Sequence, residues 1–197
     1  HLAGLKMIMK DNLAGCRDCL GAISIDVIDG KHLVQVCKEL ENDFCVELNT
    51  RDIIPLTVNE NCKIKKAYAF TCEALELLKL LGKEDGTIRR SLFNDNVRDY
   101  LGNRGGVNSE IEQTIIGEPE MFLMCNNGIT IVCSDFIQIR DKLVSINNPQ
   151  VVNGCQTCNS IFRFKDNITL SKVQVLIKLI CTEDISITNK IQVSQVP

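Results

Sequence analysis

The sequence predicts a mixed α/β fold of the α+β kind, in which a mixed sheet is flanked by helices and hairpins. Apolar runs of strand length alternate with stretches whose apolar residues recur at helical spacing, and a strand–glycine turn–helix element is expected around residue 154. Of the 197 residues, 45% are hydrophobic and 24% are charged, which is typical of a globular protein with a buried core. No apolar run approaches the roughly 20 residues that a membrane helix needs.

Residues 1–86 are expected to form an N-terminal α/β segment. Its predicted strands cover residues 22–27, 53–58 and 63–70, and its predicted helices cover residues 31–42 and 72–81. Thr71 is a candidate N-cap for the second helix, because its side-chain oxygen can accept a hydrogen bond from an N–H group of the first turn. Gly82 stands where a left-handed glycine commonly ends a helix.

Residues 87–197 are expected to form a second part, distinguished by asparagine-rich turns. The predicted elements are helices at 94–102, 109–118, 155–164 and 182–192, a hairpin-like strand pair at 136–140 and 142–146, and strands at 150–152 and 173–181. The helix from Ser109 opens on a capping box and stops before Pro119. Because the chain does not begin with Met and ends on Pro197, we expect it to be a piece of a longer protein.

Charge and cysteine content narrow the class of protein. The net charge is −3 and no basic block is present, whereas proteins that wrap duplex DNA usually carry a clear excess of Lys and Arg. Most of the 11 cysteines lie in apolar runs, where a free thiol acts as a small hydrophobic group. No secretion signal is evident at the N-terminus, so we expect a reduced, cytoplasmic protein.

The turn between Val152 and Thr157 is the first candidate ligand site. A strand that enters a helix through a glycine turn directs backbone N–H groups toward one point, where the helix dipole attracts anions. Gly154 also allows a ligand to approach the backbone closely. The candidate binding residues of this turn are Asn153, Gly154, Cys155, Gln156 and Thr157. A plain left-handed turn before a helix explains the same pattern without a ligand.

Two faces are predicted for the helix that follows this turn. One face is suited to the core, and the opposite face is polar. The core face comprises Cys155, Cys158 and Phe162, and the polar face comprises Gln156, Ser160 and Arg163.

Asparagine and arginine residues earlier in the chain are candidates to complete a polar pocket around that turn. Amide side chains offer both donors and acceptors, which suits base edges and ribose, and arginine suits phosphate. These candidates are Asn96, Arg98, Asn108, Asn126 and Asn127, and Gly128 is a candidate with them. For Asn126-Asn127-Gly128 the alternative is a purely structural role, because Asn-Gly between two apolar runs favours a type I′ hairpin turn.

Several familiar chemistries have no counterpart in the sequence. No Walker A motif and no His-Glu-x-x-His motif is present, and His32 is the only histidine besides His1. The two Cys-x-x-Cys pairs, at residues 16–19 and 155–158, are too far apart for a zinc ribbon, whose knuckles usually lie about 15–20 residues apart. The sequence therefore predicts no metal site, and it identifies neither a catalytic residue nor a cofactor.

A series of motifs runs in order from Leu92 to Phe164. It comprises Leu92-Phe93-x-x-Asn96-Val97-Arg98-Asp99-Tyr100-Leu101-Gly102, Val107-Asn108 with Ile111 and Thr114, Pro119-Glu120-x-Phe122, Asn126-Asn127-Gly128-Ile129-Thr130-Ile131 and Pro149-Gln150-Val151-Val152-Asn153-Gly154-Cys155-Gln156-Thr157. In this order the motifs resemble the AIPR family, the abortive-infection phage-resistance proteins. The resemblance implies a role in bacterial antiviral defence, often beside restriction-type systems.

The turn from Gly154 to Thr157 is also similar in kind to the phosphate-binding turns of sulfiredoxins and ParB-like proteins. In those proteins the backbone of the turn holds nucleotide phosphates. This chain has Gln156 and Thr157 where sulfiredoxins have histidine and arginine. The likeness implies phosphate binding by the backbone of the turn, less strongly than in a chain with that histidine and arginine, and the difference argues against sulfiredoxin chemistry.

Three functions are compatible with the sequence. The motifs favour a phage-resistance protein of AIPR type that binds a nucleotide or nucleic acid through a polar Asn/Arg pocket. The alternatives are a metal-dependent nuclease of a restriction-type system and a non-catalytic interaction scaffold, in which the asparagine turns only shape the core. The expected partners are a nucleotide or nucleic acid and proteins of a restriction system, and no membrane partner is expected.

Overall fold

The computed structural model describes residues 44–59, 62–93, 106–184, 187–188 and 191, apart from the side chains of residues 106–109. All of these residues lie within a compact unit that spans residues 41–197. The strand predicted at 22–27 and the helices predicted at 31–42 and 94–102 lie outside the described residues.

Strands and helices are mixed along the described part of the chain, which confirms the predicted α/β class. The strands are β1 (Cys45–Asn49), β2 (Arg51–Pro55), β3 (Lys66–Glu73), β4 (Ile129–Cys133), β5 (Asp135–Arg140), β6 (Leu143–Asn147), β7 (Gln150–Asn153) and β8 (Gln174–Cys181). The α-helices are α4 (Ala74–Leu81), α5 (Gly106–Gly117), α6 (Phe122–Cys125) and α7 (Cys155–Arg163). Short 3-10 helices are η2 (Arg90–Phe93), η4 (Pro119–Met121) and η5 (Ile168–Lys172).

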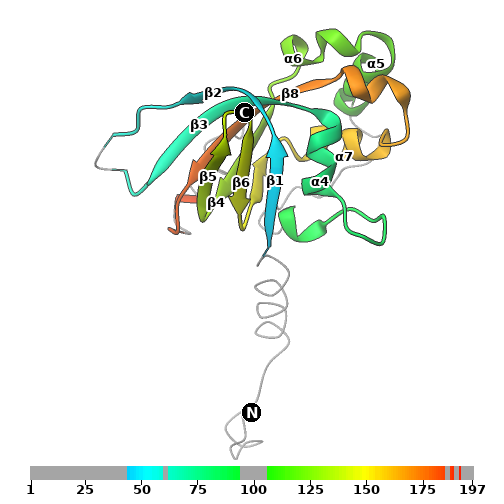
Figure 1. Ribbon diagram of the computed structural model, residues 1–197. Helices are drawn as coiled ribbons and strands as arrows, with labels where there is room; N and C mark the ends of the chain where they lie inside the picture. Colours follow the sequence, from blue (N-terminus) through cyan, green and yellow to red (C-terminus); the bar gives the residue numbers. More distant parts are fainter. Residues whose placement is uncertain (1–43, 60–61, 94–105, 185–186, 189–190, 192–197) are drawn as a thin grey trace, which may run out of the picture. The chain divides into compact units, whose positions relative to one another are not determined.

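The described strands form two sheets (Figure 1). One is three-stranded and antiparallel, in the order β1-β6-β5, and the other is five-stranded, in the order β2-β3-β8-β4-β7. Within the larger sheet only β4 and β8 run parallel to each other, and β7 runs antiparallel to β4. The end of β7 therefore lies beside the start of β4.

The larger of two hydrophobic clusters among the described residues joins the two sheets and the helices. The ring of Phe136 on β5 lies 4.4 Å from that of Tyr68 and 6.3 Å from that of Phe70, both on β3, so aromatic side chains bridge the sheets. Helix α4 contributes Leu77 and Leu80, which are fully buried. Figure 1 shows the helices gathered on one side of the strands.

Several predicted elements are confirmed within one or two residues. The hairpin-like pair is β5 and β6, the brief strand is β7, and the buried strand is β8. The predicted helix over 155–164 is α7, which begins directly after the left-handed Gly154, with φ of 84°. Helix α5 ends at Gly117, before Pro119 as predicted, but it begins at Gly106 rather than at Ser109.

The start of α4 differs from the prediction. Thr71 is not an N-cap, because it lies inside β3 and pairs with Leu176 of β8. The helix begins at Ala74, two residues later than predicted, with Glu73 at the N-cap position, because the buried strand continues through Thr71 and Cys72. Gly82 does end the helix, but in an extended conformation with φ of −89° rather than a left-handed one.

The limits of the neighbouring strands also differ from the prediction. Strand β2 ends at Pro55 and β3 begins at Lys66, so both are displaced from the predicted 53–58 and 63–70. Strand β1 was not predicted at all, although Val46 and Leu48 alternate with exposed residues. At the end of the chain, residues 182–184 are not helical, whereas 187–188 and 191 are.

The predicted hairpin at Asn126-Asn127-Gly128 is wrong. A type I′ turn needs positive φ at both central residues, and of these three only Gly128 has it, at 77°. The preceding apolar run forms helix α6, and β4 pairs with β7 and β8 instead of with the run before it. The turn is therefore a helix-to-strand connection.

Ser160 was assigned to the polar face of α7, and this is also wrong. Its side chain is completely buried, together with that of Cys158. Helix α7 packs against both α4 and α5, so it is covered on two sides. The division of the chain near residue 86 stays a prediction, although β1 and β3 pair with β6 and β8 from beyond that point.

Glu76 of α4 links the helix to β1 and makes stability depend on pH. Its carboxylate accepts hydrogen bonds from the backbone N–H of Asn49, at 3.0 Å, and from Lys79, at 2.7 Å. Burial raises the pKa of Glu76, but the hydrogen bonds from Lys79 and Asn49 outweigh burial, so the pKa lies below the ordinary 4.5. The stabilisation is therefore complete above pH 4.5 and is lost as the pH falls through the folded-state pKa.

Replacing Glu76→Gln is expected to remove this acid-dependent part of the stability. The melting temperature of the wild type, measured between pH 6 and pH 3, should fall more steeply than that of the variant. Glu84→Gln, at an exposed position in the turn after α4, is the control and should follow the wild type. Parallel melting curves for the Glu76 variant and the wild type would contradict this role.

Candidate functional site

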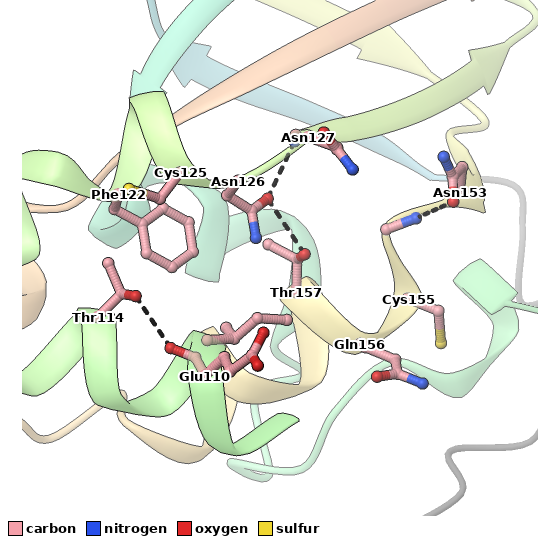
Figure 2. A pocket seen from close by; sticks show the side chains of 13 residues that line it. Glu110, Thr114, Phe122, Cys125, Asn126, Asn127, Asn153, Cys155, Gln156 and Thr157 are labelled. Carbon is pink, nitrogen blue, oxygen red and sulfur yellow. Dashed lines mark hydrogen bonds between the residues drawn. The ribbon is translucent and has the colours of Figure 1, made fainter. Parts of the chain in front are cut away.

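A cavity of about 580 Å³ opens where helices α5, α6 and α7 meet the edge of the five-stranded sheet. Its volume lies within the range of about 300–1,000 Å³ that is usual for small-molecule sites. It is lined by Glu110, Ile111, Thr114, Phe122, Cys125, Asn126, Asn127, Gly128, Asn153, Gly154, Cys155, Gln156 and Thr157 (Figure 2).

Antiparallel pairing of β4 with β7 brings the two asparagine turns together. Thr130, near the start of β4, is the partner of Asn153, the last residue of β7. The turn at 126–128 leads into β4 and the turn at 153–154 leaves β7, so both lie at the same edge of the sheet. Helix α7 then begins at this edge, beside the cavity.

The two glycines in these turns are required by close backbone contacts. A Cβ atom on Gly128 would lie 2.4 Å from the carbonyl oxygen of Leu176 on β8. A Cβ atom on Gly154 would lie 2.8 Å from the carbonyl oxygen of Gly128 and 3.0 Å from the Cα of Ile129. Both glycines also have a positive φ, which residues other than glycine rarely adopt. The backbones of β8 and the two turns are thus stacked on one another.

The side-chain amide of Asn126 is held in one orientation. Its Oδ1 accepts hydrogen bonds from the backbone N–H of Gly128, at 2.9 Å, and from the hydroxyl of Thr157, at 3.3 Å. A backbone N–H can only donate, so the oxygen must face it and the amide nitrogen must face the other way. In Figure 2 that nitrogen is turned toward the space between α5 and α7.

Asn153 has a similar arrangement on the other turn. Its Oδ1 accepts a hydrogen bond from the N–H of Gly154, at 2.8 Å, which leaves its amide nitrogen as a donor on the exposed rim of the cavity. Gly154 is the N-cap residue of α7, and it has no side chain that could cap the first N–H groups of the helix. The positive end of the helix dipole therefore lies at this rim.

The cysteines of α7 differ in their surroundings. Cys158 is completely buried, and burial raises the pKa of its thiol well above the ordinary value, so it is a protonated packing residue. Cys155 is half-buried and lines the cavity. The amide of Asn159 donates to its carbonyl oxygen, at 2.8 Å, and to its Sγ, at 3.4 Å.

Helix α5 forms the wall opposite the start of α7, and of its residues only Asn108 was predicted to belong to the site. Glu110 and Thr114 are four residues apart and share one face of α5, and the hydroxyl of Thr114 donates to the carbonyl oxygen of Glu110, at 2.9 Å. An ion pair between Glu112 and Arg163 joins α5 to α7. The spacing of Glu110 and Thr114 could have suggested a polar helix face, but not what that face contacts.

Eight of the predicted site residues come together around this one cavity. They are Asn126, Asn127, Gly128, Asn153, Gly154, Cys155, Gln156 and Thr157. Asn96 and Arg98 lie outside the described residues. The backbone of Asn108 belongs to α5, but its side chain also lies outside the described part. Within the described ranges, no cluster of three or more His, Cys, Asp or Glu side chains could hold a metal ion.

Comparison with known families assigns the region that contains the cavity to one protein family. A family model described as AIPR protein matches residues 93–195, slightly more than half of the chain and inclusive of every residue that lines the cavity. The chain belongs to the AIPR family. Membership of the AIPR family supports a role in abortive infection, that is, in defence against phage.

No curated protein and no solved structure matches this AIPR chain. In the part of the chain that the structure describes, no helix has the length and apolar character needed to cross a membrane. The family match and the geometry of the cavity are therefore the two observations on which a functional proposal can rest.

Alanine at either glycine is expected to disrupt the stacked turns. Gly128→Ala and Gly154→Ala should each lower the free energy of unfolding by about 2–4 kcal/mol, through the positive φ and the overlap with neighbouring backbone. Urea unfolding followed by circular dichroism measures the loss.

Gly117→Ala at the end of α5 is the matched control, because a Cβ atom there would meet nothing within 4 Å. This variant should be neutral or slightly stabilising. Equal stability of the Gly117 and Gly128 variants would show that the close contacts do not constrain the turns.

Proposed function

We propose that this chain acts in phage defence in the bacterial cytoplasm, and that the cavity binds a nucleotide, either free or as a unit of a nucleic acid. The observation that carries the proposal is the convergence of the Asn126 amide, the Asn153 amide and the start of α7 on one cavity of about 580 Å³. The family match supports the setting of phage defence.

The oriented Asn126 amide suits recognition of a base or a sugar. Its nitrogen is a donor whose direction is fixed by two hydrogen bonds to its oxygen, from Gly128 and Thr157. A donor that is already in place loses little conformational entropy when a ligand binds. Base edges and ribose hydroxyls present acceptors at fixed positions, so a fixed donor can discriminate among them.

The start of α7 offers a place for the negative charge of a nucleotide. The first N–H groups of an α-helix have no partners within the helix, and the helix dipole adds a partial positive charge at that end. Gly154, with no side chain, allows close approach to this backbone. A nucleotide with its phosphate near the rim and its base or sugar toward Asn126 and α5 fits this distribution of groups.

The two alternatives make different demands on the same residues. A metal-dependent nuclease needs a cluster of metal ligands, and the described residues contain none. A scaffold in which the asparagine turns only shape the core would need Asn126 for folding but not for binding. Association with proteins of a restriction system stays a prediction.

Asn126→Asp tests the binding role with little change in structure. Aspartate keeps an oxygen to accept from Gly128 and Thr157, but it loses the amide donor and places a negative charge in the cavity. Titration calorimetry of the full chain with the four ribonucleoside monophosphates should detect binding to the wild type. The variant should bind at least tenfold more weakly.

Asn167→Asp is a matched control at a turn outside the cavity. The Oδ1 of Asn167 also accepts from a backbone N–H two residues later and from a threonine hydroxyl, at 2.9 and 2.8 Å, both of Thr169. This variant should bind as the wild type does. Equal weakening in both variants, or no binding of any nucleotide by the wild type, would refute nucleotide binding at the cavity.

The same pair of variants tests the role in defence. In bacteria that express the full protein to equal levels, the Asn167 variant should reduce phage plaque formation as the wild type does. The Asn126 variant should lose that protection, because its cavity no longer binds the ligand. Full protection by a stably folded Asn126 variant would separate the cavity from phage defence.

A further inference from the structure

The described lining of the cavity carries a negative charge and no positive charge. Among the described residues that line it, Glu110 is the only one with a charged side chain. Arg163, which lies on α7, is engaged in an ion pair with Glu112. The described walls thus offer amide donors at the two turns and one carboxylate on α5, with no lysine or arginine among the lining residues.

The backbone of Glu110 is held in position on α5, whereas its carboxylate has no hydrogen-bond partner among the described residues. Its backbone oxygen accepts from Thr114, and α5 is anchored by the completely buried Ile115 and by the ion pair between Glu112 and Arg163. Figure 2 shows the Glu110 side chain reaching from α5 toward α7, across from Asn126 and Thr157. The side chain is exposed, so water solvates the carboxylate when the cavity is empty.

A ligand that fills the cavity must replace that water. A carboxylate only accepts hydrogen bonds, and its two oxygens suit a pair of neighbouring donors. If a ligand offers no donors, the desolvated carboxylate is left unsatisfied, which is strongly unfavourable. Such a site rejects analogues that lack the donors by a larger factor than an apolar pocket can achieve.

We propose that Glu110 determines the specificity of the cavity, by accepting hydrogen bonds from two adjacent donors on the bound nucleotide. The proposal rests on the proposed nucleotide binding and adds to it the class of group that is selected. Two parts of a nucleotide carry adjacent donors, namely the N1–H and N2 amino groups of guanine and the 2′ and 3′ hydroxyls of ribose. The other bases present a single donor group at their Watson–Crick edge.

The guanine edge is complementary to both walls of the cavity. Guanine has an acceptor, O6, beside its two donors, and the fixed amide nitrogen of Asn126 is a donor. The ribose diol is complementary to Glu110 alone. The guanine edge and the ribose diol both present a pair of adjacent donors, and nucleotide analogues that lack one donor of either pair distinguish between them.

The test compares Kd values of GMP, IMP, 2′-deoxy-GMP and AMP for the full-chain wild type and Glu110→Gln. IMP lacks the N2 amino group, and 2′-deoxy-GMP lacks one hydroxyl of the diol. For the wild type, at least one of these two analogues should bind at least tenfold more weakly than GMP. A loss with IMP indicates the guanine edge, and a loss with 2′-deoxy-GMP indicates the ribose.

Glu110→Gln should weaken the binding of GMP at least tenfold. It should also remove the difference in affinity between GMP and the analogue that the wild type binds more weakly. This direction is diagnostic, because removing a negative charge would by itself strengthen the binding of an anionic phosphate. Glu118→Gln, at an exposed residue beyond the end of α5 that does not line the cavity, is the charge-matched control and should bind as the wild type does.

The two proposals fail in distinguishable ways. Suppose that the wild type binds GMP and that Asn126→Asp binds GMP more weakly. If Glu110→Gln then binds GMP as tightly as the wild type or more tightly, the role of Glu110 is overturned and nucleotide binding stands. Equal affinity of the wild type for GMP, IMP and 2′-deoxy-GMP also overturns the role of Glu110. If the wild type binds none of these nucleotides, both proposals fail.

Discussion

Close stacking of three backbone segments is the constraint on which the rest of the site depends. Strand β8 lies against Gly128, and the turn at Gly128 lies against Gly154. Both contacts are so close that neither glycine has space for a Cβ atom. This stacking fixes where β4 begins and where α7 begins. Because the two turns lie 26 residues apart in the sequence, neither of them could define the cavity alone.

The chemistry of the cavity follows from the same stacking. With the turn at Gly128 fixed, its N–H orients the oxygen of Asn126, and the amide nitrogen of Asn126 becomes a donor in the cavity. With the start of α7 fixed, Thr157 completes this arrangement from the other side. Helix α5, joined to α7 by Glu112 and Arg163, then places a carboxylate opposite the amide. Packing thus determines which polar atoms remain for a ligand.

Local patterns in the sequence predicted the elements whose conformation is determined locally. Helix α7 and strand β8 show clear periodicity, and Gly154 marked the start of the helix. The hairpin at Asn126-Asn127-Gly128 was wrong because turn type depends on which strands pair, and the partners of β4 come from far along the chain. Strand β1 was missed for a similar reason, since its partner β6 lies about 100 residues later.

The candidate site shows the same division between local and long-range information. Both turns could be identified from their asparagines and glycines, and they do lie together. Glu110 could not be assigned, because a carboxylate on a helix gains a role only from what faces it, and that depends on the packing of α5 against α7. The burial of Ser160 has the same cause, since helical periodicity does not reveal that α7 is covered on two sides.

The most direct test of the account is a nuclear magnetic resonance titration of the isotope-labelled full chain with GMP. If the two turns form one ligand site, the largest chemical-shift changes should occur together at the side-chain amide of Asn126 and at the backbone N–H groups of Gly128 and Thr157. The side-chain amide of Asn167 should not move. Changes confined to residues away from both turns, or changes at one turn without the other, would contradict the account.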